Sequence, residues 1–221
     1  MRRMGMFPIG FSRWGVLVAK VEHGEYAHVH FYEWPPRGKE GHEGICFVPA
    51  DLASVSVVRE YMENKADAWD LTEEECYEIS LICDELLSNA IIATYNRGIS
   101  EHVVLRYKFG RDHIIISVLD YGGGFDLNQV ERELPDGENL SEFMESLKKY
   151  RGELIRKVKI HGREVEHPRF GRGLRIVSGL ADFMIVLFHN DEGKFSQKLE
   201  SSTVGTLISV RYLFKSKLDS T

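Results

Sequence analysis

The chain has 221 residues, of which 43% are hydrophobic and 28% are charged. This is enough material for one large globular domain, or for one domain with an appendage. The formal net charge of -6 argues against a generic electrostatic affinity for nucleic acid.

The sequence offers no segment suited to a membrane. Arg2 and Arg3 are not followed by an unbroken apolar stretch, and no apolar run approaches the roughly 20 residues that span a bilayer. The three cysteines are an odd number without metal-site spacing, and Cys76 and Cys83 fall on an apolar helix face where buried free thiols are expected. These features predict a cytoplasmic protein that binds neither membrane nor nucleic acid.

The N-terminal part is expected to be a β-hairpin. Residues 13–34 alternate between apolar and polar side chains on both sides of a turn at residues 23–25. Residues 35–44 are rich in Pro and Gly and are typical of a loop. The sequence therefore predicts an N-terminal β-hairpin extension and loop over residues 1–44, followed by the main domain over residues 45–221.

Two helices are predicted in the first part of the main domain. After a short strand at residues 45–48, Asp51 is expected to cap a helix that ends near Asn64. Thr72 and Glu75 have the spacing of a capping box at the start of a second helix, which should end around residues 95–98.

Glu85 and Asn89 lie in the middle of this second helix. They are four residues apart, so they project from one face, one turn apart. A carboxylate beside a carboxamide suits a hydrated Mg²⁺. Such a pair alone is more often a solvated surface, so its weight depends on motifs further along the chain.

A carboxylate is expected at the end of a β-hairpin. Strands are predicted over residues 103–109 and 113–119, and Asp120 follows the second strand directly. Three consecutive glycines, Gly122 to Gly124, come next. Glycines let a ligand approach the backbone closely, although they can also mark a simple turn.

The least regular section, residues 128–170, is expected to contain an amphipathic helix over residues 140–150 and a small hairpin over residues 154–165. Between Leu147 and Arg175, Lys and Arg far outnumber Glu, which fits either a solvated surface or contact with an anionic group such as a polyphosphate. Gly171-Arg172-Gly173 then opens a helix, where backbone N–H groups can meet a phosphate.

Further strands are predicted over residues 183–188, 194–199 and 204–214. The order of elements is helices, hairpin, long excursion, helix and strands. This order predicts an α+β sandwich with helices on one face of a mixed sheet.

Four motifs follow one another along the chain: Glu85-x-x-x-Asn89, Asp120-x-Gly122-x-Gly124, Gly171-x-Gly173-Leu174 and Gly205-Thr206. This series resembles the GHKL ATP-binding superfamily of gyrases, chaperones, histidine kinases and mismatch-repair proteins. It is most similar to the bacterial anti-sigma factor serine/threonine kinases. The resemblance covers about residues 45–214 and implies a two-layer α/β sandwich of the Bergerat type that binds ATP and Mg²⁺.

The resemblance also implies residue roles. Glu85 would be the catalytic base for an incoming hydroxyl or water, Asn89 would ligate Mg²⁺, and Asp120 would accept a hydrogen bond from the adenine amino group. Glycines would leave room beside the nucleotide or present amides to its phosphates, and Thr206 would support Asp120. The remaining nucleotide-binding positions would be Gly122, Gly124, Gly171, Arg172, Gly173 and Leu174.

Three features depart from the family pattern. Family members often carry a basic or histidine residue shortly after the Asn, where this chain has Ile92, Ala93 and Thr94. The excursion over about residues 126–170 would be an enlarged and basic ATP lid. The N-terminal hairpin has no counterpart in the compact family form.

Three functions are compatible with these motifs. The first is an ATP·Mg²⁺-dependent serine/threonine protein kinase of the anti-sigma factor type, which regulates an antagonist-type protein or a sigma factor by phosphorylation and partner switching, and which could act as a homodimer. The second is a nucleotide-gated protein-binding module with little or no kinase activity. The third is an ATP-independent scaffold with a decayed pocket.

Overall fold

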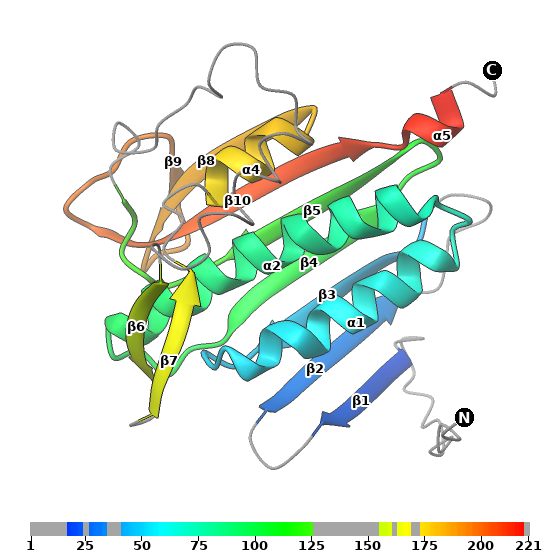
Figure 1. Ribbon diagram of the computed structural model, residues 1–221. Coiled ribbons are helices and arrows are strands. Elements are labelled where there is room, and N and C mark those ends of the chain that lie inside the picture. Colours follow the sequence, from blue (N-terminus) through cyan, green and yellow to red (C-terminus); the bar gives the residue numbers. More distant parts are fainter. Residues whose placement is uncertain are drawn as a thin grey trace.

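An eight-stranded antiparallel sheet carries helices on one of its faces (Figure 1). The computed structural model describes residues 17–23, 27–34, 41–125, 155–160, 163–168 and 173–218. The sheet order is β1-β2-β3-β4-β5-β10-β8-β9. Its strands are β1 (Leu17–His23), β2 (Ala27–Trp34), β3 (Glu43–Val48), β4 (Val103–Phe109), β5 (His113–Leu119), β8 (Phe183–Asn190), β9 (Phe195–Ser196) and β10 (Thr203–Leu213).

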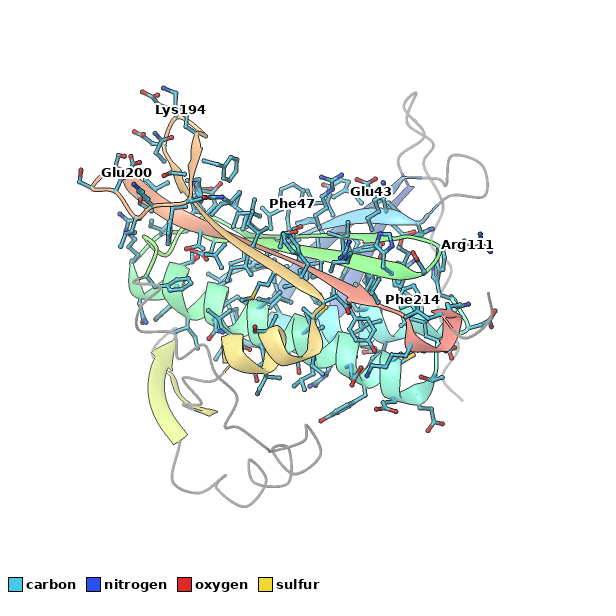
Figure 2. The ribbon with its side chains drawn as sticks, turned by 90° about the horizontal axis from the view of Figure 1, so that it is seen from above. Glu43, Phe47, Arg111, Lys194, Glu200 and Phe214 are labelled. Atoms are coloured by element: carbon cyan, nitrogen blue, oxygen red, sulfur yellow. The ribbon has the colours of Figure 1, made fainter. Side chains whose placement is uncertain are left out.

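The helices are α1 (Ala53–Asp67), α2 (Glu73–Asn96), α4 (Gly173–Leu180) and α5 (Lys215–Leu218). The first three lie together against one side of the sheet, and α5 follows β10 at its end (Figures 1 and 2). This arrangement confirms the predicted two-layer α/β sandwich. Phe47 projects from the other side of the sheet (Figure 2) and is 37% exposed.

The predicted start of α1 is wrong by one residue. Leu52, not Asp51, is the N-cap, and it makes no side-chain capping bond. Asp51 Oδ1 instead accepts a hydrogen bond from the Ala53 amide. The helix also continues beyond Asn64 to Asp67, because the buried Ala66 extends the apolar face. For α2 the capping box of Thr72 and Glu75 is confirmed.

The predicted mixed sheet is also wrong, because every described strand pair is antiparallel. Short connections reverse the chain between β1 and β2 and between β4 and β5. Two consecutive helices, α1 and α2, return it between β3 and β4. The predicted strand over residues 194–199 shrinks to β9, since the Ser196 hydroxyl accepts the Lys198 amide and draws the backbone out of the ladder.

The N-terminal hairpin adds two strands to the same sheet. Val29 and Phe31 of β2 are fully buried and belong to the core that α1 and α2 form with β3, β4, β5 and β10. Burial of such side chains against a shared core is the main stabilising force for the added strands.

A buried carboxylate network also ties this hairpin to α1 and β4. Glu33 is 6% exposed and accepts hydrogen bonds from Tyr61 and Tyr107, while Lys65 forms an ion pair with it at 2.5 Å. Gly44 lies between Glu33 and Tyr107 in the sheet, and a Cβ on Gly44 would stand 2.4 Å from the Tyr107 hydroxyl. The missing side chain at Gly44 thus lets the two residues meet across the intervening strand.

The small basic hairpin predicted in the excursion is confirmed. β6 (Ile155–Ile160) pairs with β7 (Arg163–Pro168) in a separate two-stranded antiparallel sheet. The helix predicted over residues 140–150, and most of the lid predicted over residues 126–170, lie outside the described residues. Within the parts of the chain that the structure describes, no helix is both long and apolar enough to span a bilayer.

Candidate functional site

Asp120 is held at nearly every polar atom. It follows β5 directly, is 7% exposed, and its amide donates to the Thr206 carbonyl at 2.9 Å. Its own carbonyl accepts from His189 Nε2 at 2.7 Å. Carboxylate oxygen Oδ1 accepts from the amides of Gly122 at 2.7 Å and Thr206 at 3.3 Å. Within the described residues Oδ2 accepts no hydrogen bond, so this oxygen is available to a ligand.

The environment of Asp120 raises its pKa. Burial is the largest influence, and it outweighs the amides of Gly122 and Thr206 and the nearby His189, so the pKa rises to about 6. At neutral pH the side chain is therefore mostly ionised and can accept a hydrogen bond.

The glycine loop after Asp120 packs against the last part of α2. A Cβ on Gly122 would stand 2.3 Å from the Ala93 Cβ, so only glycine fits this contact. Ala93 is one of the residues that depart from the family pattern after Asn89. The structure gives it a packing role, since a long basic side chain here would meet the loop backbone.

The two glycines that follow have a backbone conformation suited to glycine. Gly123 has φ +85° and Gly124 has φ +81°. The Gly123 amide donates to the Val204 carbonyl at 3.0 Å, and Arg97 Nη1 donates to the same carbonyl at 2.6 Å. A Cβ on Gly124 would stand 2.6 Å from Leu199 Cδ1. The loop is therefore clamped between the end of α2 and the start of β10.

Gly173 brings the third motif to the middle of α2. It is buried at the first turn of α4, and a Cβ there would stand 2.4 Å from Glu85 Oε2 and 3.0 Å from Asn89 Nδ2. Leu174 packs, partly buried, against the core. Gly171 and Arg172 lie outside the described residues.

One face of α2 thus contacts both the glycine loop after Asp120 and the start of α4. Glu85, Asn89 and Ala93 are spaced four residues apart, so they lie in a row along the helix. The first two contact the start of α4, and the third contacts the glycine loop after Asp120. Residues from three distant parts of the chain meet along this row, which we call the α2 ridge (Glu85, Asn89 and Ala93).

Glu85 has a proton affinity suited to neutral pH. Burial, together with the negative charge of the neighbouring Asp84, raises the pKa of Glu85 to about 7. Asp84 itself pairs with Arg59 at 2.7 Å. Asn89 is exposed, so it is free of any role in the core. A partly buried carboxylate beside an exposed carboxamide can take up a proton and offer a neutral oxygen ligand.

The sequence motifs include neither Arg97 nor His189, two residues that also shape this site. Gly205 was recognised only as part of a late motif, although a Cβ there would stand 1.8 Å from the Asp120 carbonyl oxygen. Arg97 and His189 carry no local signal, because their roles depend on strand register and sheet order. A hollow of about 290 Å³ elsewhere, lined by His30, Tyr32, Phe47 and His102, shares no residue with this site.

In this α/β sandwich a buried carboxylate, a glycine loop and a helix-start glycine are brought near one helix, an arrangement suited to binding a nucleotide. The chain belongs to the histidine kinase-like ATPase domain family, whose model matches residues 48–195. This match confirms the resemblance to the GHKL superfamily.

A relative agrees with this placement. The serine-protein kinase RsbW of Oceanobacillus iheyensis is 28% identical over 86 residues, which are 39% of this chain and 54% of that protein. The match thus spans about half the length of this curated relative. RsbW is named as a serine-protein kinase, and the motif series of this chain most resembles kinases of that kind.

Proposed function

We propose that this protein is an ATP·Mg²⁺-dependent serine/threonine protein kinase of the anti-sigma factor type. The observation that carries the proposal is the α2 ridge, which joins the loop after Asp120 to the start of α4. A bound nucleotide needs one site for its base and another for its phosphates. We assign the base to the loop after Asp120 and the phosphates to the start of α4, and the ridge lies along both. The family match and the serine kinase relative support the same conclusion.

At the base end, Asp120 accepts a hydrogen bond from the adenine amino group through its available Oδ2. The amides of Gly122 and Thr206 hold the opposite oxygen, so the carboxylate keeps one orientation. Gly122 and Gly124 let the loop pack closely on Ala93 and Leu199, which holds its backbone in place beside the nucleotide.

At the phosphate end, the start of α4 presents backbone amides to the phosphates. Gly173 lies at the positive end of the helix, and Leu174 anchors that end to the core. Gly171 and Arg172, which precede it in the sequence, are proposed to bind the phosphates as well. Asn89 supplies a ligand for Mg²⁺. Asn89 offers a neutral oxygen ligand, and phosphate oxygens would supply others when ATP is bound.

Glu85 accepts the proton of the attacking serine or threonine hydroxyl. With a pKa near 7 it is ionised in about half of the molecules at neutral pH and can act as a base. Mg²⁺, when bound, neutralises charge on the phosphates. Otherwise the protein positions groups, which is the main requirement of phosphoryl transfer.

The partner is an antagonist-type protein whose phosphorylation changes its affinity for the kinase, with a sigma factor as the competing partner. The kinase acts in the cytoplasm and can form a homodimer. The presence of three free cysteine thiols supports a reducing compartment.

The experiment combines calorimetry with a transfer assay. The purified chain, with ATP and Mg²⁺, should bind nucleotide and transfer labelled phosphate to an antagonist protein encoded beside it, and Glu85→Gln should bind but not transfer. Binding without transfer to any such antagonist would favour the nucleotide-gated binding module. That alternative has its own support, because Ala93 stands where a basic residue is frequent. Absence of ATP and ADP binding would leave only the scaffold.

A further inference from the structure

His189 reaches across one strand to hold the backbone of another. In the sheet, β10 lies between β5 and β8, so β8 and β5 are not neighbours (Figure 1). His189 lies near the end of β8, yet its Nε2 is 2.7 Å from the carbonyl oxygen of Asp120, directly after β5. The side chain must therefore pass over the intervening strand.

Gly205 is the point at which His189 crosses β10. The two residues are directly paired in the β8–β10 register. A Cβ on Gly205 would stand 1.8 Å from the Asp120 carbonyl oxygen and 2.5 Å from His189 Nε2. Any other residue at this position would fill the path of the hydrogen bond, so the absence of a side chain permits it.

The imidazole has a defined orientation and a defined proton. His189 is 5% exposed, and its ring meets Tyr121 edge to face with centroids 5.3 Å apart and Phe195 at 6.1 Å. A backbone carbonyl is only an acceptor, so Nε2 carries the hydrogen that it donates to Asp120. The shorter contact of this buried ring is therefore the hydrogen bond from Nε2 to Asp120 at 2.7 Å, while Nδ1 lies 3.4 Å from the Asn190 carbonyl oxygen.

We propose that His189 is a positioning residue for nucleobase recognition, which fixes the base-reading carboxylate of Asp120 by holding its backbone carbonyl. The inference rests on the proposed function, because it assumes that Asp120 reads adenine. Thr206 and Gly122 hold the amide and Oδ1 of Asp120 from one side. His189 holds the carbonyl from β8, across β10, and this hydrogen bond restrains rotation of the peptide between Asp120 and Tyr121.

This role has a consequence that a purely structural residue would not have. Adenine presents an amino donor where guanine presents a carbonyl acceptor, and a correctly aimed carboxylate accepts the first and repels the second. Misalignment of Asp120 should therefore reduce the preference for ATP over GTP. The ratio of ATP to ADP affinity should stay the same, since both share the base.

Three variants of His189 distinguish the effect of its hydrogen-bond donor from the effect of its ring shape. His189→Gln places an amide N–H near the position of Nε2, His189→Asn is too short to reach, and His189→Phe keeps a ring without a donor. We expect the ATP-over-GTP preference to fall about tenfold in the Phe and Asn variants, as for the loss of one hydrogen bond, and to be retained in the Gln variant. Calorimetry with Mg²⁺ gives the affinities, after melting curves without nucleotide establish folding.

The matched control is His113→Phe, at the opposite end of β5, where the imidazole is 30% exposed and contacts Asp112. It should leave the preference unchanged. A folded His189→Phe with wild-type preference overturns the inference. If that variant does not fold, equal preference in the Gln and Asn variants overturns it, and a lower preference in Asn supports it. A wild-type protein that binds no ATP refutes the proposed function itself, and this inference with it.

Discussion

A carboxylate oxygen of Glu85 lies so close to the backbone of Gly173 that a single added methyl group would stand 2.4 Å from it. The two residues come from α2 and α4, which meet only in the folded protein. Their contact places the expected base beside the expected phosphate site, and it makes Gly173 a sensitive position.

Gly173→Ala should weaken ATP binding more than it weakens the fold. The added methyl would displace the flexible Glu85 and Asn89 side chains, which can move at a cost of less than about 1 kcal/mol. The displaced groups would no longer face the phosphates, so we expect the affinity for ATP·Mg²⁺ to fall about tenfold or more. Calorimetry and urea denaturation measure the two effects. Ser178→Ala, an exposed change on the same helix, is the control, and similar affinities in both variants would contradict the assignment.

Asn89→Ala should reduce nucleotide binding only when Mg²⁺ is present. The side chain is exposed, so its loss should leave the free energy of unfolding within about 0.5 kcal/mol. Loss of a metal-binding group should lower Mg²⁺-dependent affinity about tenfold or more. Titrations with Mg²⁺ and with EDTA distinguish the two effects. An equal loss in both would mean that Asn89 does not act through the metal.

Glu85→Gln should change how stability depends on pH. Burial raises the pKa of Glu85 from 4.5 in the unfolded chain to about 7 in the native state, so native protein binds this proton more tightly. Its stabilising effect is complete below about pH 4.5 and is lost as the pH rises through about 7. Between about pH 5 and pH 8, wild type should lose on the order of 1–3 kcal/mol relative to Glu85→Gln. Parallel pH–stability curves would show that Glu85 titrates normally.

Glu33→Gln should destabilise the protein by about 2–4 kcal/mol. Burial would raise the pKa of Glu33, but hydrogen bonds from Lys65, Tyr61 and His42 lower it to about 2, so the charge is present at neutral pH. Its contribution to stability is present above about pH 4.5 and is lost as the pH falls toward 2. Urea denaturation at neutral pH provides the measurement.

The control is Glu43→Gln on the neighbouring strand β3. Glu43 pairs with Arg106 where both side chains are substantially exposed, at 30% and 59%. Removal of such a surface pair should cost less than about 1 kcal/mol. If the two variants were equally stable, the Glu33 network would contribute no more than a surface ion pair.

Gly124→Ala should cost more stability than Gly193→Ala, although both positions have a positive φ. At Gly193 an added Cβ meets nothing within 4 Å, so only the backbone strain of about 1–2 kcal/mol applies. At Gly124 the Cβ would also stand 2.6 Å from Leu199 Cδ1 and 3.0 Å from Phe188 Cδ1, which should add about 1–3 kcal/mol. Equal losses by denaturant unfolding would show that the loop relaxes freely.

The sequence alone determined those features that depend on near neighbours along the chain. The capping box of Thr72 and Glu75 and the strands on each side of residues 110–112 follow from residues only a few positions apart, and the confirmed family resemblance follows from the order of four such short motifs along the chain. Short patterns also predicted some details wrongly. Asp51 was expected to be the N-cap of α1, but Leu52 takes that position and Asp51 only accepts a hydrogen bond from the Ala53 amide.

Only the tertiary structure decided the direction of every strand and the meeting of distant residues. His189 and Asp120 are separated by 69 residues, and their hydrogen bond exists because β8 and β10 pair in a register that puts Gly205 between them. Strand register and sheet order arise from packing of the whole domain, so no short pattern encodes them. The same reason explains why Glu85 and Asn89, an unremarkable pair on a helix, lie against Gly173 in the folded protein.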